Sequence, residues 1–200
     1  MILRGLSPIM DERARVLILG SFPSTASLAA QQYYAHKQNQ FWKIIGTLLG
    51  QPLAELDYPV RQQAVRDAGL AIWDVYAMCE RAGSLDSAIR NAIPNDFAAL
   101  QKSALAGRRA GGSAALKHAG GLPALARVCF NGRMAGRFAP QLAALGFETL
   151  ILPSTSPANA SWSFERKLAA WRDGLASADG NFQGIADQAR HTGVGRYPAR

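Results

Sequence analysis

The sequence has 200 residues, 48% of them hydrophobic and 18% charged, which favours one compact domain with a full core over a disordered or fibrous chain. Lysine and arginine outnumber acidic residues by 22 to 14, and the formal charge of +8 suits a polyanionic partner such as nucleic acid, although it also serves ordinary solubility. No apolar run reaches the ~18 residues of a membrane span and no signal-peptide pattern is present, so we expect a cytoplasmic protein without a membrane partner.

Four apolar runs predict buried strands. The first covers residues 16–19, where Val-Leu-Ile-Leu continues without alternation until Gly20. Unbroken runs of this kind are typical of strands that are covered on both faces, as in parallel sheets. Similar runs at 70–73, 128–130 and 149–152 each end at polar or turn-forming residues.

Two segments with helical spacing lie among these strands. The first covers residues 39–49, with Asn39 as a candidate N-cap and Gly50 at its end. The second covers residues 164–171, with Gly174 as its predicted stop. This alternation predicts an α/β fold, a single domain with a central, mainly parallel four-stranded sheet flanked by helices. Ligands of such sheets bind outside the carboxyl ends of the strands, where the loops after all four runs should meet.

Two regions lack this regularity. Residues 104–121 are rich in Ala, Gly and basic side chains without an apolar period, which indicates a mobile surface connection. Residues 176–200 contain few large apolar side chains, which indicates a flexible, basic-to-neutral C-terminal tail. We therefore assign the domain itself to residues 1–175.

Cysteine and histidine residues are too scattered to predict a metal centre. Cys79 and Cys129 form no Cys-x-x-Cys pair, and His36, His118 and His191 lack metal-binding spacing. We expect neither a metal nor another cofactor.

Three short motifs lie around the predicted strand ends, at residues 20–24 (GSFPS), 34–42 (YAHKQNQFW) and 152–158 (LPSTSPA). Their order, spacing and placement resemble the uracil-DNA glycosylase superfamily, specifically its hypoxanthine, or deoxyinosine, branch. The similarity spans roughly residues 14–175, and its supporting segments lie at 69–75, 81–87, 130–132 and 165–171.

The resemblance implies a monofunctional DNA glycosylase of base excision repair, which we expect to be a monomer. Such an enzyme flips a deaminated base out of DNA and hydrolyses its N-glycosidic bond. Hypoxanthine is the implied base; a mismatch-type uracil-DNA glycosylase and a catalytically inactive DNA-binding member of the fold are the alternatives. An enzyme acting on free nucleosides fits less well, because the chain lacks a glycine-rich nucleotide-binding loop.

The catalytic residue is expected in the second motif. Uracil-excising relatives usually have a polar, water-positioning residue in the first motif, where this chain has Phe22. In the hypoxanthine branch an Asn of the later motif is implied to take over, and Asn39 stands at that place. A carboxamide can hold a water molecule but cannot act as a general base at neutral pH. Asn39 would therefore act by positioning; the alternative is that it only caps a helix.

The flipped base is expected to stack on an aromatic ring and to be recognised at its edge. Tyr34 is the stacking candidate and Phe22 the second, whereas Phe41 and Trp42 fit the core. Asp74 could accept a hydrogen bond from hypoxanthine N1–H while backbone amides near Phe22 bind O6, or it could cap a helix instead. The predicted base-binding residues are Gly20, Ser21, Phe22, Tyr34, His36 and Asp74.

Two further residues of the second motif have ordinary structural readings beside their functional ones. His36 could bind the leaving base, although a structural histidine is the alternative. Lys37 allows Schiff-base chemistry, although a lone lysine in a loop is usually a phosphate contact.

The third motif predicts a contact with the DNA backbone. Its small hydroxyls and backbone amides precede a helix, which suits phosphate binding, and the resemblance implies that this loop also fills the gap left by the flipped base. The loop residues are Ser154, Thr155, Ser156, Pro157, Ala158 and Asn159.

Overall fold

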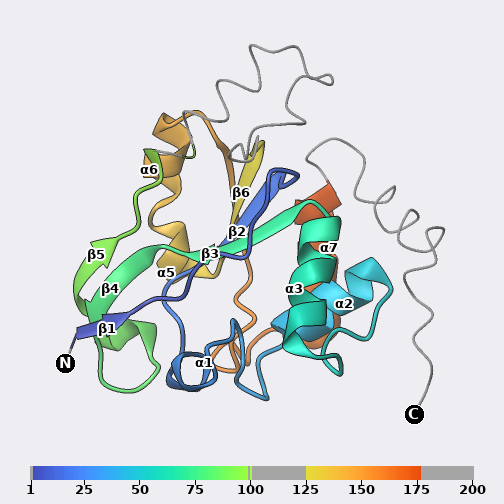
Figure 1. The fold of residues 1–200 in the computed structure, drawn as a ribbon, viewed down its shortest axis with the longest axis horizontal. Helices are drawn as coiled ribbons and strands as arrows, with labels where there is room; N and C mark the ends of the chain where they lie inside the picture. Colours follow the sequence, from blue (N-terminus) through green and yellow to red (C-terminus); the bar gives the residue numbers. More distant parts are fainter. Residues whose placement is uncertain (1, 99, 101–124, 177–200) are drawn as a thin grey trace.

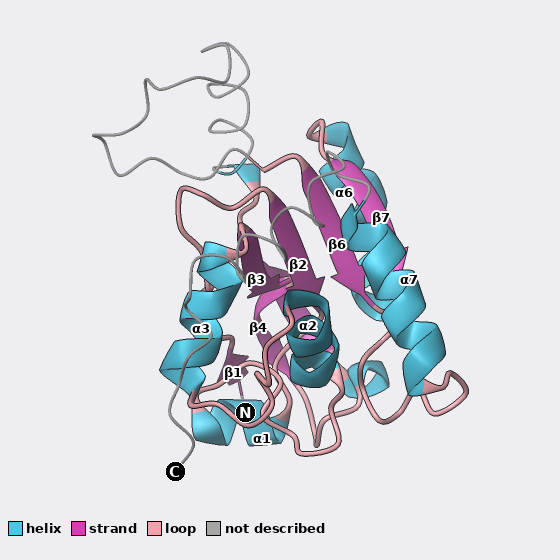
Figure 2. Ribbon diagram, turned by 90° about the vertical axis from the view of Figure 1, so that its right-hand side faces the viewer, coloured by secondary structure: helices cyan, strands magenta, loops and turns pink. Residues whose placement is uncertain are grey.

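The four predicted strands form one parallel sheet in the order β3-β2-β6-β7, which Figure 2 shows side by side. Figure 1 shows the arrangement of the elements. The computed structural model describes residues 2–98, 100 and 125–176. The predicted connection at 104–121 and all but the first residue of the predicted tail lie outside the described residues. The α/β class and the parallel four-stranded sheet are confirmed. The strands are β2 (Val16–Gly20), β3 (Leu70–Asp74), β6 (Arg127–Asn131) and β7 (Glu148–Leu152).

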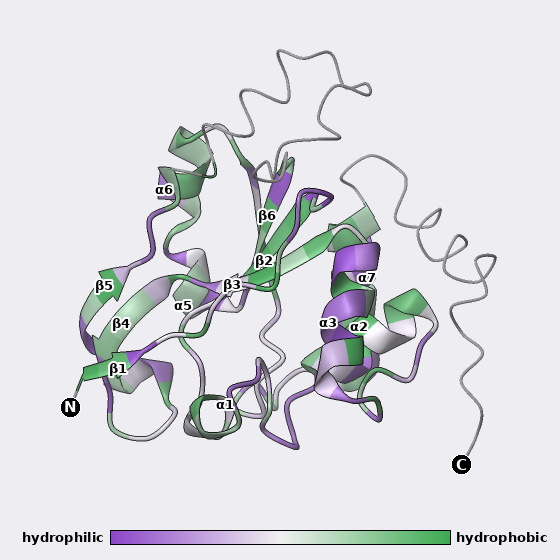
Figure 3. Cartoon of the chain, in the orientation of Figure 1, coloured by the Kyte–Doolittle hydropathy of each residue, from purple (hydrophilic) through white to green (hydrophobic). Residues whose placement is uncertain are grey.

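Helices cover both faces of this sheet, because its central strands are apolar on both sides (Figure 3). Ile18 of β2 belongs to the core with Ile45 and Trp171, and Figure 2 shows the helices of this layer in front of the sheet. Leu17 and Leu19 belong to the core on the opposite face. The first layer contains α2 (Phe41–Leu49), α3 (Tyr58–Asp67) and α7 (Phe164–Ala176), and the second contains α5 (Arg133–Gly136) and α6 (Ala139–Ala144).

The predicted end of the last helix at Gly174 is wrong. α7 continues to Ala176, and Gly174 lies within it. A Cβ on Gly174 would lie 2.5 Å from Leu152 Cδ2 and 2.7 Å from Leu150 Cδ2. This glycine therefore allows the helix to approach β7 closely, and it does not end the helix.

A second, antiparallel sheet of three strands was not predicted. Its order is β1-β4-β5, and it begins where β3 continues past Val75 into β4. These strands are partly exposed, and the β4–β5 pairing has register shifts, so they lack the unbroken apolar signal of the central strands. The remaining elements are β1 (Ile2–Arg4), α1 (Thr25–Ala30), β4 (Tyr76–Glu80), the 3₁₀ turn η1 (Asp86–Ala88) and β5 (Arg90–Pro94).

The parallel arrangement brings the carboxyl ends of four strands to one edge of the sheet. β2, β3, β6 and β7 end there at Gly20, Asp74, Asn131 and Leu152. In the described part of the chain, no helix has the length and apolar character needed to cross a membrane.

Candidate active site

A cavity of about 710 Å³ opens at the carboxyl edge of the parallel sheet. The last residues of all four strands line it: Gly20, Asp74, Asn131 and Leu152. This is the edge at which open α/β sheets bind their ligands. The first and third sequence motifs and two residues of the second, which lie far apart in the chain, meet around this one space.

The floor of the cavity depends on a close approach between β2 and β3. Gly20 pairs with Asp74 in the parallel ladder. A Cβ on Gly20 would lie 2.4 Å from Asp74 Oδ1 and 3.4 Å from Tyr34 Oη. Glycine is therefore required at this position for the carboxyl group to lie against the strand.

The Asp74 carboxyl group is buried and incompletely bonded. The residue is 4% exposed, and its Oδ2 atom has no hydrogen-bond partner among the described residues. Burial raises the pKa of Asp74 from 3.8 to about 8; the nearby Asp86 adds to this rise and Arg81 opposes it. Burial thus favours the protonated form of this carboxyl group more than in a free aspartate, and the residue lines the cavity.

Tyr34 is held rigidly beside Asp74. Its backbone has a φ of +55°, and its ring stacks on Phe41 with the centroids 3.8 Å apart and the planes at 19°. The Tyr34 hydroxyl has no hydrogen-bond partner, and burial raises its pKa. Asn131 lies near this hydroxyl, but its amide pairs with Thr155 instead, donating to Oγ1 and accepting from the backbone N, each at 2.9 Å. One face of the predicted stacking ring is thus occupied by Phe41.

Phe22 is the other aromatic residue of the first motif at the cavity. It is 6% exposed and lines the space, so its predicted position at the site matches the geometry. The guanidinium carbon of Arg81 lies 5.2 Å from the centre of its ring, and Arg81 also donates a hydrogen bond to the Pro23 carbonyl. The cation fixes the ring from outside the cavity.

Asn39 lines the cavity and also stabilises the start of α2. Its Oδ1 accepts a hydrogen bond of 3.0 Å from Phe41 N, the first residue of the helix, and the N-cap itself is Gln40. The helix thus begins one residue later than an Asn39 cap predicts. A carboxamide oxygen has two lone pairs, so the bond to Phe41 leaves one for another donor.

The turn that contains Asn39 is tied to the third motif. Gln40 N donates to the Thr155 carbonyl at 3.0 Å, and the buried Lys167 donates from Nζ to Gln40 Oε1 at 3.0 Å. Burial lowers the pKa of Lys167. Contacts from α7 and the β7 loop therefore fix the position of Asn39 from behind.

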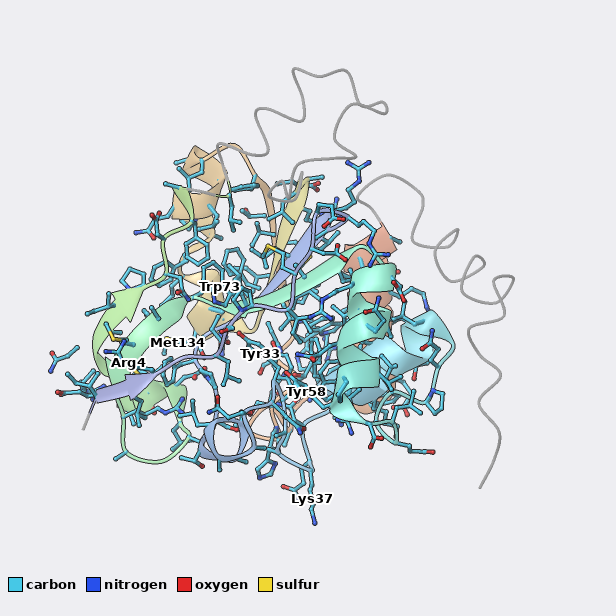
Figure 4. All side chains as sticks on the ribbon, in the orientation of Figure 1. Arg4, Tyr33, Lys37, Tyr58, Trp73 and Met134 are labelled. Carbon is cyan, nitrogen blue, oxygen red and sulfur yellow. The ribbon has the colours of Figure 1, made fainter. Side chains whose placement is uncertain are left out.

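His36 and Lys37 are not brought to the cavity. Both are exposed, and Figure 4 shows the Lys37 side chain pointing away from the body of the protein. The His36 ring accepts a hydrogen bond at Nδ1 from Gln38 N at 3.3 Å, within its own turn. The geometry favours the structural reading of His36 and gives no support to Schiff-base chemistry at Lys37.

The third motif forms one wall of the cavity, and its members have different exposures. Ser154, Ser156, Ala158 and Asn159 line the space, whereas Pro157 is exposed at the loop tip outside it. Internal bonds shape this loop: Ser156 N donates to Ser154 Oγ, and Asn159 Nδ2 donates to the Ser154 carbonyl. Thr155 also lines the cavity but is 0% exposed, and its hydroxyl accepts from Asn131. Thr155 therefore supports the loop and is not available to a phosphate.

The cavity lining also includes three residues that were not predicted as site residues: Ser84, Leu85 and Asp86. Ser21 Oγ donates to Asp86 Oδ1 at 2.6 Å, and Thr25 N donates to Ser84 Oγ at 3.0 Å. These contacts join the first motif to the connection between β4 and β5, which belongs to the sheet that was not predicted. In the sequence, only the family resemblance of residues 81–87 pointed to this connection. Trp162 and Arg133 line the cavity as well.

No group of three or more His, Cys, Asp or Glu side chains suited to a metal ion occurs among the described residues. The arrangement is thus a pocket of hydrogen-bonding groups and aromatic rings. Such a pocket suits a polar planar ligand, and the Asn39 carboxamide beside it has an acceptor position free.

Comparison with known proteins assigns the chain to a class. Its sequence matches the Uracil DNA glycosylase superfamily over residues 8–174, and the chain belongs to this superfamily. The resemblance drawn from the motifs is confirmed.

Two similar proteins carry the name hypoxanthine DNA glycosylase. The one from Methanosarcina acetivorans is 36% identical over 167 residues, covering 84% of this chain and 94% of the relative. The one from Methanosarcina barkeri is 34% identical over 175 residues, covering 88% and 96%. A solution NMR structure of a Methanosarcina acetivorans protein assigned to the uracil DNA glycosylases has a TM-score of 0.69 at 34% identity, covering 86% of this chain and 98% of that one.

Asp74→Asn should remove a pH-dependent loss of stability. The pKa of Asp74 is 3.8 in the unfolded chain and about 8 in the folded protein. Below pH 3.8 the carboxyl group is protonated in both states. As the pH rises towards 8, ionisation favours the unfolded state and lowers the free energy of unfolding. The difference in unfolding free energy between variant and wild type should therefore grow between about pH 4 and 8, by roughly 1.4 kcal/mol per pH unit at most. Urea denaturation across this range measures it. A difference between Asp74→Asn and the wild type that stays constant with pH would contradict the assignment.

Proposed function

We propose that the chain is a hypoxanthine DNA glycosylase, which hydrolyses the N-glycosidic bond of deoxyinosine in DNA. The observation that carries this proposal is the buried Asp74 carboxyl group at the floor of the cavity, with Oδ2 unpaired. A free, buried hydrogen-bonding group requires a polar partner, and the edge of a flipped base supplies one. The names of the two Methanosarcina relatives support the same substrate.

Hypoxanthine differs from adenine at the edge that would face Asp74. Hypoxanthine has a donor at N1–H and an acceptor at O6, whereas adenine has an acceptor at N1 and a donor at N6. In its ionised, acceptor-only form Asp74 accepts the N1–H hydrogen bond of hypoxanthine and has no proton to donate to N1 of adenine. The neighbouring Phe22 ring gives the base a surface for stacking. Recognition of deaminated adenine thus depends on a group that the fold keeps in place beside Gly20.

Hydrolysis of the bond requires a held water molecule and little else from the protein. The bond breaks through a transition state in which the sugar is positively charged, so that the base leaves with the electron pair. Asn39 holds the water, the water oxygen bonds to the anomeric carbon, and its proton passes to the departing base. The net positive charge of the chain and the serine-rich third motif assist binding of the DNA backbone.

A single-turnover lesion panel tests the proposal directly. With enzyme in excess over duplexes containing hypoxanthine, uracil or xanthine, we expect the fastest base release from hypoxanthine, and no covalent adduct after borohydride treatment. Faster release of uracil would indicate a mismatch-type uracil glycosylase. Tight binding without release of any base would indicate an inactive DNA-binding member of the fold.

Asn39→Ala should reduce the single-turnover rate on hypoxanthine by on the order of 100-fold or more, because the water loses its fixed position. It should also destabilise the protein by about 1 kcal/mol, since Phe41 N loses its acceptor. Asn39→Ser separates the two effects. Its hydroxyl can still accept from the helix and should restore stability, while the shorter side chain leaves the rate low. Full activity in either variant would contradict the assignment.

Asp74→Ala should lower the preference for hypoxanthine over adenine. The ratio of the two single-turnover rates isolates recognition of the base edge from the chemical step, which both substrates share. We expect this ratio to fall by at least about 10-fold, the equivalent of one lost hydrogen bond. An unchanged ratio would remove Asp74 from the recognition of N1–H.

A further inference from the structure

The Tyr34 hydroxyl is a second polar group at the cavity without a partner. It is buried, and the residue lines the cavity. The neighbouring Tyr33 hydroxyl, by contrast, donates to the Leu6 carbonyl at 3.1 Å. A buried hydroxyl without a partner lowers stability. The unpaired hydroxyl of Tyr34 therefore needs an explanation other than folding.

The hydroxyl is held in a fixed direction. The ring stacks on Phe41, and the positive φ of Tyr34 places a non-glycine residue in a left-handed conformation that is costly to maintain. Both neighbouring residues are anchored, because Tyr33 N donates to Tyr58 Oη at 2.9 Å and Ala35 N donates to Ser27 Oγ at 3.2 Å. The strained conformation thus keeps the phenol at the cavity floor.

The Tyr34 hydroxyl and the Asp74 carboxyl group both lie next to Gly20. The position that a Gly20 Cβ would occupy lies 3.4 Å from Tyr34 Oη and 2.4 Å from Asp74 Oδ1. The nearby Asn131 amide bonds to Thr155, and among the described residues no group forms a hydrogen bond with Tyr34 Oη. A ligand that reaches the floor would therefore meet a phenol and a carboxyl group side by side.

We infer that the Tyr34 hydroxyl donates a hydrogen bond to the base carbonyl oxygen O6, next to the N1–H that Asp74 accepts. This inference rests on the proposed function and assigns Tyr34 a role through its hydroxyl, where the sequence predicted stacking of its ring. The adjacent N1–H and C6=O groups of hypoxanthine match the adjacent carboxyl and phenol groups. Adenine offers no carbonyl oxygen for the phenol.

The same hydrogen bond assists the reaction itself. When the glycosidic bond breaks, the base takes the electron pair, and part of the negative charge spreads through the purine ring to O6. A donor fixed at O6 binds this charge more strongly in the transition state than in the ground state. Loss of the hydroxyl should therefore lower the rate more than it lowers DNA affinity.

Tyr34→Phe tests the inference when it is combined with a change in the base. Single-turnover rates are measured for wild type and variant on duplexes containing hypoxanthine or unsubstituted purine, which lacks O6. We expect the variant to lose on the order of 10- to 100-fold on hypoxanthine and much less on purine. Its stability should equal or exceed that of the wild type, because the lost hydroxyl has no partner. Equal losses on both bases, or no loss on hypoxanthine, would overturn the inference.

A control variant and a binding assay show whether the loss of rate comes from the hydrogen bond to O6. Tyr58→Phe is the control, since its hydroxyl supports the same segment from outside the cavity; it should leave the ratio of hypoxanthine to purine rates unchanged. Affinities for duplexes with a 2′-fluorinated, uncleavable hypoxanthine or purine nucleotide separate the inference from the proposed function. If the wild type releases no hypoxanthine, the proposed function fails. The inference then stands only if the wild type prefers hypoxanthine in this binding assay and Tyr34→Phe does not.

Discussion

The contact between Gly20 and the Asp74 carboxyl group is the constraint on which the site depends. Two adjacent parallel strands end at these residues, and only the absence of a side chain on Gly20 lets the carboxyl group lie against β2. The contact keeps the carboxyl group away from water, raises its pKa to about 8 and leaves one oxygen unpaired. The fold thus keeps a buried carboxyl group with an unpaired oxygen in a residue that lines the cavity, where a ligand can supply the missing hydrogen bond.

The remaining parts of the site are arranged around this floor by contacts that lie behind it. The Asn131–Thr155 pair joins the loops after β6 and β7, and the bonds of Gln40 to Thr155 and Lys167 join the start of α2 to the same loop. Thr155 and Lys167 are buried, and Gln40 and Asn131 are half-buried. These contacts give Asn39 and Asp74 fixed positions relative to each other, as the proposed hydrolysis of a flipped nucleotide requires.

The central sheet could be predicted because its strands are buried on both faces, so their apolar runs are unbroken, as at 16–19. The antiparallel sheet could not be predicted, because strands such as β5 are mostly exposed and have no apolar run. The sequence also placed Asn39 and Asp74 at the site through motif position. It could not show that Thr155 is buried or that the Tyr34 ring stacks on Phe41, since such contacts join segments distant in the chain or depend on backbone conformation. The prediction that the last helix ends at Gly174 was wrong, because a glycine within a helix and one at its end look the same in a sequence.

A structure of the protein bound to duplex DNA with an uncleavable 2′-fluorinated deoxyinosine tests the central claim most directly. If Asp74 recognises the flipped base, the hypoxanthine should lie outside the duplex, in the cavity at the carboxyl ends of β2 and β3. Its N1 atom should lie within hydrogen-bond distance of the Asp74 carboxyl group. The proposed role of Asp74 would be contradicted by a base that remains stacked in the duplex. A base bound with its N1–O6 edge turned away from Asp74 would contradict it as well.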